Sequence, residues 1–389
     1  MKKKILSLAL IFAAFAVNAQ TPMEYAERMA QSEMKRNPEV WMADFAKKLK
    51  WDYTQGLMAK TMIELWKATG NETYYTYAKG LVDQFIEADG KIKTYKLSDY
   101  NIDRVNPGKA LFEIYYRDKD PKVKTAIDTL RSQLRSQPRV DEGGFWHKKI
   151  YPWQMWLDGL YMGSPFYAEY IQNFGTPDEF ADVVKQFTVA HKHTLNLETG
   201  LNHHAWDEKK EQPWADKVTG RSPESWGRAM GWYAMALVDV LDFIPADRAE
   251  DRAEILRILQ DVAKAIKNTQ QPSGVWYQVL SRPNEKGNYE EATVSCMFTY
   301  AIEKAVRMNY IDKSYLAVAQ KGYDGIIKNF IQENDDKTIS LTRCCAVAGL
   351  GGTPYRSGTF DYYVNETIRD NDPKGVGPFI LMCIEMAKN

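Results

Sequence analysis

RAMGWYAMALVDVL (228–241), followed after a short break by RAEILRILQDVAKAIKN (252–268), is the pair of stretches that decides the fold. The first stretch is almost entirely apolar and rich in Ala and Gly. The second places apolar residues at intervals of three and four among charged ones, which is typical of a helix with one buried face. A helix of small apolar residues packs closely among others, and an amphipathic helix covers it. The pair therefore predicts an inner and an outer helix.

This pairing of an apolar helix with a charged helix recurs along the chain. About six pairs in strict alternation predict an all-α fold, an (α/α)6 barrel of inner and outer helices, as one domain over residues 20–389. An open helical solenoid is the alternative, but it requires a fixed repeat length, and the spacing here is irregular. The other apolar stretches begin near Tyr53, Asn106, Asp158, Glu291 and Gly375, and the other charged stretches cover 72–88, 121–134, 177–193 and 314–331. Residues 22–36 can supply the missing charged partner for either the first or the last apolar stretch.

Short polar motifs mark the expected helix starts. Asn106 followed by Pro107 predicts an N-cap with proline at the first helical position. Two starts compete for the third inner helix. One places Asp158 in the first turn or in the turn before it, and the other begins at Ser164-Pro165. The sequence leaves this choice open.

The first 19 residues have the features of a signal peptide. Lysines at positions 2–4 precede an apolar run over residues 5–17, and small residues follow at 17–19. This arrangement predicts cleavage before Gln20 and export of the mature chain. An uncleaved membrane anchor is disfavoured, because the apolar run is too short to span a bilayer comfortably.

Composition excludes several classes of partner and cofactor. Basic and acidic residues number 51 each, so no net charge attracts nucleic acid or a membrane surface. The four cysteines lack the spacing of a disulfide framework or a zinc site, and we expect buried free thiols. His203 and His204 precede two acidic residues, but adjacent side chains on a helix or strand point apart. No metal and no cofactor are expected, and the sequence does not indicate an oligomeric state.

The strict alternation also predicts where a binding site lies. It makes the inner helices parallel, so their N-terminal ends meet at one face of the barrel. Helix N-termini favour anions, which suits a ligand that carries a carboxylate. The unusual residues of the chain gather in the loops that enter these helices: Gln55, Asp103, His147, Lys148, Trp156, Asp158, His204, Arg228, Trp232, Glu291 and Lys374.

Two aspartates at this predicted mouth are candidates for acid–base chemistry. Sugar hydrolysis normally requires two carboxyl groups, one of which holds a proton near neutral pH. Asp158 lies in MWLDGLYM (155–162), whose apolar neighbours favour the protonated form, and a nearby carboxylate at Asp103 would favour it further. Both residues also have a structural interpretation, since Asp is a common helix cap and Asp103 suits a surface turn.

Cationic and aromatic residues complete the expected site. Arg228 in the first turn of an inner helix meets the unfavourable end of the helix dipole, so either a bound anion or an ordinary salt bridge to Asp103 or Glu291 explains it. Trp232, one turn further, can stack on a sugar ring or belong to the core. His204 suits a hydrogen-bonding loop residue as well as a ligand contact.

Several long motifs resemble one known family, the unsaturated rhamnogalacturonyl hydrolases of glycoside hydrolase family 105. The resemblance covers nearly the whole mature chain in the expected order, and its motifs together are more specific than any one alone. It implies the same (α/α)6 barrel. The motifs are WLDGLYMGSPF (156–166), GLNHHAWDE (200–208), RAMGWYAMAL (228–237), GNYEEATVSCMFTYAI (287–302) and NDPKGVGPFIL (371–381).

The resemblance also implies an activity and a set of site residues. The substrate is an oligosaccharide left by a polysaccharide lyase, with a 4,5-unsaturated uronate at its non-reducing end. Asp158 protonates C4 and helps water add at C5, and the hemiketal collapses to release the sugar. Such a small oligosaccharide favours the periplasm as the location. Four positions match family residues around the unsaturated sugar: Asp103, His204, Arg228 and Trp232. His147 and Lys148 match a WHK segment that precedes the catalytic Asp in the family. Gln55 is carried over from the first inner helix.

Two rival functions stay open at this point. An unsaturated glucuronyl hydrolase that acts on glycosaminoglycan fragments shares this fold and chemistry. A non-catalytic sugar-binding protein of the same fold would bind the oligosaccharide and leave its double bond intact. The sugar beyond the scissile bond is not indicated by the sequence.

Overall fold

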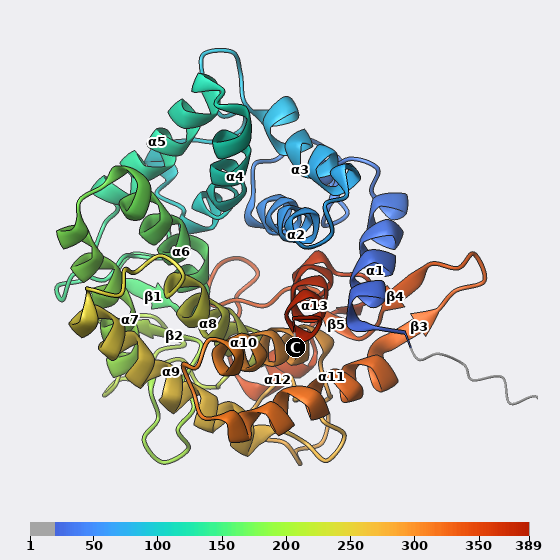
Figure 1. Cartoon of the computed structure of the whole chain (residues 1–389). Helices are drawn as coiled ribbons and strands as arrows, with labels where there is room; N and C mark the ends of the chain where they lie inside the picture. Colours follow the sequence, from blue (N-terminus) through green and yellow to red (C-terminus); the bar gives the residue numbers. More distant parts are fainter. Residues whose placement is uncertain (1–19, 389) are drawn as a thin grey trace, which may run out of the picture.

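The computed structural model describes residues 20–388, so the expected signal peptide, residues 1–19, lies outside the described residues. In the described part of the chain, twelve helices form two concentric rings (Figure 1). The all-α (α/α)6 barrel expected from the sequence is confirmed. The inner ring comprises α2 (Tyr53–Thr69), α4 (Gly108–Asp118), α6 (Leu157–Phe174), α8 (Gly227–Val240), α10 (Ala292–Arg307) and α13 (Pro373–Met386). The outer ring comprises α1 (Pro22–Arg36), α3 (Glu72–Phe85), α5 (Pro121–Ser136), α7 (Phe180–Thr194), α9 (Ala249–Thr269) and α11 (Leu316–Phe330).

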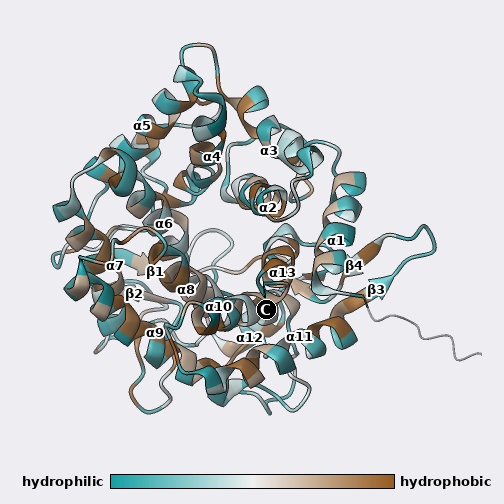
Figure 2. Ribbon diagram, viewed as in Figure 1, coloured by the Kyte–Doolittle hydropathy of each residue, from teal (hydrophilic) through white to brown (hydrophobic). Residues whose placement is uncertain are grey.

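The inner helices pack closely because glycine lies at their contacts. A Cβ at Gly56 of α2 would lie 2.3 Å from Cα of Pro107, directly before α4, and a Cβ at Gly231 of α8 would lie 2.6 Å from Sδ of Met297 on α10. Protein interiors have little free volume, so a larger residue at either position would push neighbouring inner helices apart. Figure 2 shows the hydrophobic residues concentrated between the rings and the hydrophilic ones toward the outside.

Three of the outer helices, α1, α3 and α5, begin at a polar side chain that caps them, and α1 completes the ring. Thr21 and Glu24 form a capping box at α1, and Asp120 caps α5 ahead of a proline. Although α1 comes first in the chain, it packs against α13, the last inner helix (Figure 1). Residues 22–36 therefore supply the missing outer helix, and of the two positions that the sequence left open, they take the one beside the last inner helix.

Two expected helix starts were wrong. Asn106 does not cap α4, which begins two residues later, because the Asn106 amide donates instead to the carbonyl oxygen of Tyr53 at 2.9 Å. The start at Ser164-Pro165 is also wrong, since α6 runs through Pro165 without a break. Asp158 consequently lies in the first turn of α6. Its side chain does not cap this helix, because the N-cap position belongs to Trp156.

Short antiparallel ribbons tie down the long loops. β1 (Gln154–Trp156), directly before α6, pairs with β2 (Ala205–Asp207) in the loop that leads to α8. β5 (Cys344–Cys345) pairs with β6 (Ile368–Arg369) on either side of the short helix α12 (Phe360–Val364). A third ribbon, β3 (Ile331–Glu333) with β4 (Ile339–Leu341), lies beside α1. The first two ribbons hold the loops that enter three inner helices, and so position the side chains of the site.

The four cysteines are free and buried, as expected. None of the described helices is both long and apolar enough to cross a bilayer.

Candidate active site

A cavity lies where the N-terminal ends of the inner helices meet. Its walls come from α2, α6, α8 and α13, from the segment before α4, and from the loops that the ribbons hold. The lining residues are Tyr53, Asp103, His147, Lys148, Tyr151, Trp156, Asp158, Met162, Trp226, Arg228, Trp232, Val347, Ala348, Arg356 and Lys374. Segments more than 300 residues apart in sequence thus form one site.

Asp158 reaches this cavity from the first turn of α6, with one histidine behind it. Its side chain is mostly buried, and its Oδ2 lies 3.0 Å from Nε2 of the fully buried His204. The other ring nitrogen of His204, Nδ1, lies 2.7 Å from the Tyr363 hydroxyl. Burial raises the pKa of Tyr363 well above its ordinary value, so this hydroxyl stays protonated and can donate to Nδ1. When Tyr363 donates this hydrogen bond, Nδ1 is the acceptor, and the ring proton lies on Nε2, the nitrogen nearer Asp158.

Asp103 has a different environment, because two basic side chains hold it. Nζ of Lys148 lies 2.6 Å from one carboxylate oxygen, and Nε2 of His147 lies 3.2 Å from the other. Burial opposes ionisation here, but Lys148 and His147 together bring the pKa of Asp103 well below its ordinary value. Asp103 is therefore a carboxylate at neutral pH. Lys148 balances the negative charge of Asp103.

A stack of rings forms one wall of the cavity. The Trp156 indole lies between His147 and Tyr151, with ring centroids 4.9 Å apart on each side and interplanar angles of 2° and 6°. Gly159 makes room for this stack, because a Cβ there would lie 2.8 Å from Nδ1 of His147. On another wall, Trp232 stacks on Tyr161 at 4.7 Å. Aromatic faces of this kind bind the apolar faces of sugar rings.

The lining carries more cationic than anionic side chains. Lys148, Arg228, Arg356 and Lys374 line the cavity together with only two carboxylates, those of Asp103 and Asp158. Arg228 is buried, donates to the carbonyl oxygen of Ala346, and lies 3.8 Å from Glu291. Its expected salt bridge to Glu291 therefore exists, and the same guanidinium also faces the cavity. An excess of positive charge suits a ligand that carries a carboxylate.

The structure brings together most of the residues expected from the sequence. Asp103, His147, Lys148, Trp156, Asp158, Arg228 and Trp232 line one cavity, and Lys374 joins them. His204 does not line it and instead contacts Asp158 from behind. Gln55 does not line it either, because its amide donates to the carbonyl oxygen of Ala43 at 2.9 Å and so anchors the chain before α2.

Other lining residues were missed by the sequence analysis. Arg356 donates to the Tyr151 hydroxyl at 2.9 Å and to the carbonyl oxygens of the loop around Leu350. It lies in an irregular loop without helical periodicity, so no local pattern places it at the mouth. Trp226 lies one residue before α8 and packs on His204 with centroids 4.9 Å apart. Because Trp226 lies close to the RAMGWYAMAL motif in the sequence, that motif could have indicated its place at the mouth of the barrel.

Carboxyl groups, aromatic platforms and cations at one end of an (α/α)6 barrel are the features of a carbohydrate-processing enzyme. A family model described as Glycosyl Hydrolase Family 88 matches residues 25–389. The chain belongs to this family and is a glycoside hydrolase.

Relatives and solved structures agree with this assignment. A glycoside hydrolase of family 105 from C. acetobutylicum is 42% identical, with a TM-score of 0.90 over 94% of this chain and 99% of that one. Protein Atu3128 of Agrobacterium fabrum is 37% identical over 58% of this chain and 97% of its own length. The unsaturated rhamnogalacturonyl hydrolase YesR of Bacillus subtilis is 29% identical over 71% of this chain and 76% of its own. The resemblance to family 105 is thereby confirmed.

One more distant structure shares the fold alone. The unsaturated glucuronyl hydrolase from Bacillus sp. GL1 is 14% identical, with a TM-score of 0.65 over 94% of this chain and 95% of that one.

Proposed function

We propose that this enzyme releases the 4,5-unsaturated uronic acid from the non-reducing end of lyase-generated rhamnogalacturonan oligosaccharides. The observation that carries the proposal is the placement of Asp158, backed by His204, in a cavity whose lining has an excess of cations. The likeness to YesR, named as an unsaturated rhamnogalacturonyl hydrolase, supports the choice of substrate.

The chemistry requires one group that gives a proton and takes one back. In the proposed reaction the Asp158 carboxyl protonates C4 of the C4=C5 double bond, and positive charge develops at C5 beside the ring oxygen. Water adds to C5 and returns a proton to the Asp158 carboxylate. The resulting hemiketal opens to a ketone, and the remaining hemiacetal at C1 expels the leaving sugar. The separation rule for two carboxyl groups in retaining and inverting glycosidases does not apply to this route.

The other lining residues have binding roles in this proposal. Arg228 and Lys374 attract the uronate carboxylate, which is attached to C5. Trp232, which stacks on Tyr161 on one side, offers a flat face to a sugar ring, whereas Trp156 has Tyr151 and His147 stacked on its two faces and lines the cavity with its edge. Asp103, held as a carboxylate by Lys148, accepts hydrogen bonds from sugar hydroxyls. None of these roles requires a metal or a cofactor.

The test follows the ultraviolet absorbance of the conjugated double bond during incubation with lyase-generated rhamnogalacturonan oligosaccharides. The wild type is expected to remove this absorbance. Asp158→Asn is expected to lower the rate by about 10²–10⁴-fold, the usual contribution of general acid–base catalysis. Circular dichroism of Asp158→Asn confirms that the fold is retained, and calorimetry shows that it still binds the oligosaccharide.

Each rival function predicts a different outcome. Loss of absorbance only with unsaturated glycosaminoglycan disaccharides would identify a glucuronyl hydrolase and contradict the pectin assignment. Binding without loss of absorbance on any unsaturated uronide would indicate a sugar-binding protein. A fully active Asp158→Asn variant would refute the role of Asp158.

A further inference from the structure

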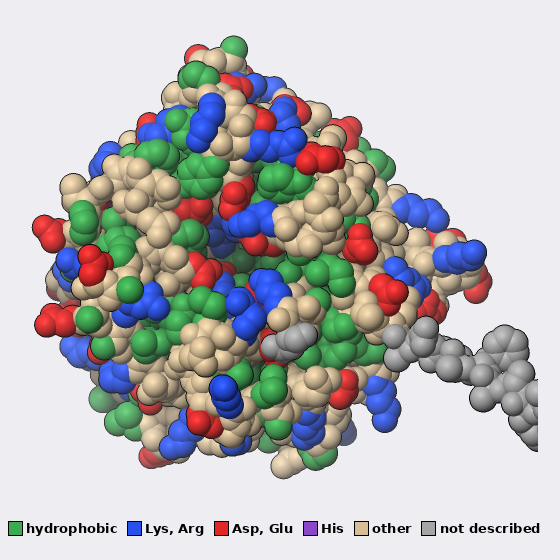
Figure 3. Space-filling model, in the orientation of Figure 1, with side chains coloured by type: hydrophobic (Ala, Val, Ile, Leu, Met, Phe, Trp, Pro, Cys, Tyr) green, Lys and Arg blue, Asp and Glu red, His purple; other side chains and the backbone are tan. Residues whose placement is uncertain are grey.

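A second cavity lies inside the barrel, at the end opposite the candidate active site. Its walls come from the later turns of α2, α6, α8, α10 and α13, and its floor includes Lys109 and Tyr161. This end of the molecule faces the viewer in Figure 3, where a central depression is edged by basic and acidic side chains. Tyr161 stacks on Trp232, which lines the active-site cavity, so this pair of rings separates the two cavities.

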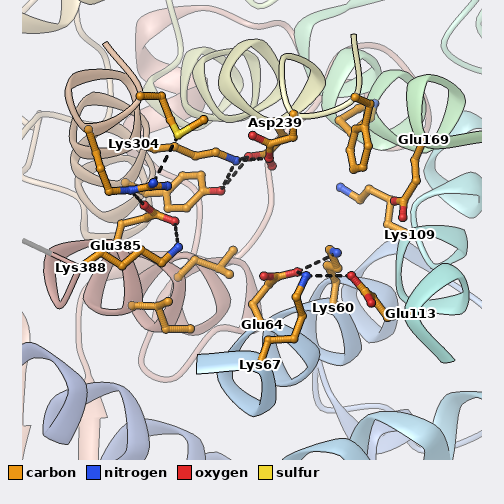
Figure 4. Close-up of a pocket in the computed structure, with 18 of the residues that line it drawn as sticks. Lys60, Glu64, Lys67, Lys109, Glu113, Glu169, Asp239, Lys304, Glu385 and Lys388 are labelled. Atoms are coloured by element: carbon orange, nitrogen blue, oxygen red, sulfur yellow. Dashed lines mark hydrogen bonds and ion pairs between the residues drawn. The ribbon is translucent and has the colours of Figure 1, made fainter. Parts of the chain in front are cut away.

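Most of the charged groups in this second cavity are paired with one another (Figure 4). Across the cavity wall, Lys304 lies 2.8 Å from Asp239 and 2.6 Å from Asp242. The remaining pairs are Lys60 with Glu64 at 2.8 Å, Lys67 with Glu113 at 2.7 Å, and Glu385 with both Arg307 at 2.7 Å and Lys388 at 2.5 Å. These pairs leave N–H groups and oxygen lone pairs free to bind hydroxyl groups, while their net charge is already balanced.

Lys109 is the one basic side chain lining this cavity that has no ion pair among the described residues. It is only 4% exposed, and no described carboxylate lies within ion-pair distance of it. Its Nζ lies 3.3 Å from the centroid of the Tyr161 ring and donates to the Tyr161 carbonyl oxygen at 3.3 Å. The other side of the amino group faces the cavity (Figure 4). Burial lowers the pKa of Lys109 well below its ordinary value.

Glu169 lies beside Lys109 on the same wall and has no ion-pair partner among the described residues (Figure 4). It is 3% exposed, and burial raises the pKa of Glu169 to about 8. Glu169 is therefore largely protonated at neutral pH, and its carboxyl group can donate a hydrogen bond. An amino group without an anion thus lies next to a carboxyl O–H donor.

We propose that this cavity binds a small hydroxylated carboxylate, such as a sugar acid, with its carboxylate at Lys109 and Glu169. The bound carboxylate supplies the anion that Lys109 lacks, and it accepts a hydrogen bond from Glu169. A single unpaired amine, which carries one positive charge once it is protonated, matches a single negative charge, and this favours a monocarboxylate over a phosphate dianion. The paired groups around it bind the hydroxyls of the ligand. This proposal is independent of the reaction at Asp158.

Binding is expected to take up a proton. A carboxylate beside Lys109 raises its pKa, so the amine becomes an ammonium ion on binding. The charged groups that face Lys109 from the neighbouring helices are Lys60, Glu169, Asp239 and Lys304. Lys60 and Lys304 are already paired with carboxylates, which leaves Lys109 as the group that gains the proton. Affinity consequently falls as the pH rises.

The test is isothermal titration calorimetry of D-galacturonate against the mature wild-type chain, in two buffers with different ionisation enthalpies. We expect binding with net proton uptake, and no comparable binding of the neutral sugar D-galactose. Lys109→Met keeps the length of the side chain but removes the amine, and is expected to weaken this binding at least tenfold and to abolish the proton uptake. Lys67→Met, which changes another lysine of the same cavity lining but one paired with Glu113, is the matched control and is expected to bind within threefold of the wild type.

A crystal of the wild type soaked in galacturonate locates the bound molecule without any variant. Density for the sugar acid beside Lys109 supports the proposal. Density at the active-site cavity alone would overturn it, as would unchanged affinity and proton uptake in a folded Lys109→Met variant. Equal binding of galactose would also overturn it, because the carboxylate would then contribute nothing. Lys109→Met is expected to keep its activity on unsaturated oligosaccharides, which separates this test from that of the proposed function.

Discussion

Replacing Lys148 by Met tests whether Asp103 is held as a buried carboxylate. The two charged groups lie 2.6 Å apart, and their side chains are 21% and 11% exposed. At an effective dielectric constant of about 20, two charges at this distance attract each other by about 6 kcal/mol. Much of this attraction offsets the cost of burying both ions. Leaving Asp103 without its partner is therefore expected to reduce the free energy of unfolding by about 3 kcal/mol at pH 7.

The pH dependence of this loss identifies its cause. In the wild type, Lys148 and His147 lower the pKa of Asp103, so the pair stabilises the fold above the unfolded pKa of Asp and still does so at pH 5. In Lys148→Met the lysine no longer offsets the burial of Asp103, so burial raises the pKa of Asp103. Asp103 therefore takes up a proton as the pH falls, and the loss in the free energy of unfolding becomes smaller. We expect the difference from the wild type to decrease by about 1 kcal/mol between pH 7 and pH 5.

The assay is urea unfolding followed by circular dichroism at both pH values. Lys149→Met, an exposed lysine next in the chain, is the matched control and is expected to change stability by less than about 0.5 kcal/mol. The double variant Lys148→Met with Asp103→Asn is expected to recover most of the lost stability, because no uncompensated charge is buried. A loss below about 1 kcal/mol, or an equal loss at both pH values, would refute the reasoning.

Three further changes test other parts of the site. Tyr363→Phe removes the hydroxyl that lies 2.7 Å from His204. We expect it to lower kcat on unsaturated oligosaccharides about tenfold with little change in KM. An unchanged kcat would mean that the orientation of His204 does not matter. Gly159→Ala introduces a Cβ 2.8 Å from His147. We expect it to destabilise the fold by about 1 kcal/mol and to weaken substrate binding. A gain in stability would show that the stack of His147, Trp156 and Tyr151 moves freely. Export is proposed from the sequence, so N-terminal sequencing of the protein purified from its native cells is expected to begin at Gln20, and a retained Met1 would contradict cleavage.

Local patterns predict the barrel because each helix pair carries its own signal. RAMGWYAMALVDVL shows an inner helix and RAEILRILQDVAKAIKN an outer one, and neither depends on distant residues. Strict alternation then places the N-terminal ends of the inner helices together, which explains why Asp158 and Arg228 were expected at one mouth. The helix starts were less predictable. Asn106 has the sequence context of a cap, but a contact with Tyr53 of the neighbouring inner helix uses its side chain.

The parts of the site that were not predicted depend on loops far apart in sequence. Arg356 reaches Tyr151 across 205 residues, and Tyr363 reaches His204 across 159 residues. Both come from the segment between β5 and β6, in which the only helix, α12, is too short to show a periodicity that would indicate where the segment folds back. The pattern of the first inner helix also places Gln55 near the mouth, but only the structure shows that its amide binds the carbonyl oxygen of Ala43.

The two carboxylates of the site have separate roles because their partners differ. Asp103 faces an ammonium group and a histidine, and the resulting low pKa leaves it without a proton to give at neutral pH. Asp158 faces His204, a fully buried ring whose other nitrogen is bound to a tyrosine hydroxyl, and no described lysine or arginine forms an ion pair with it. The proposed reaction therefore assigns the proton donor to Asp158. If Asp103 were the proton donor instead, Asp103→Asn would abolish turnover as completely as Asp158→Asn. We expect Asp103→Asn to raise KM through lost contacts to the sugar and to keep the pH dependence of kcat, because in the proposed reaction the proton comes from Asp158.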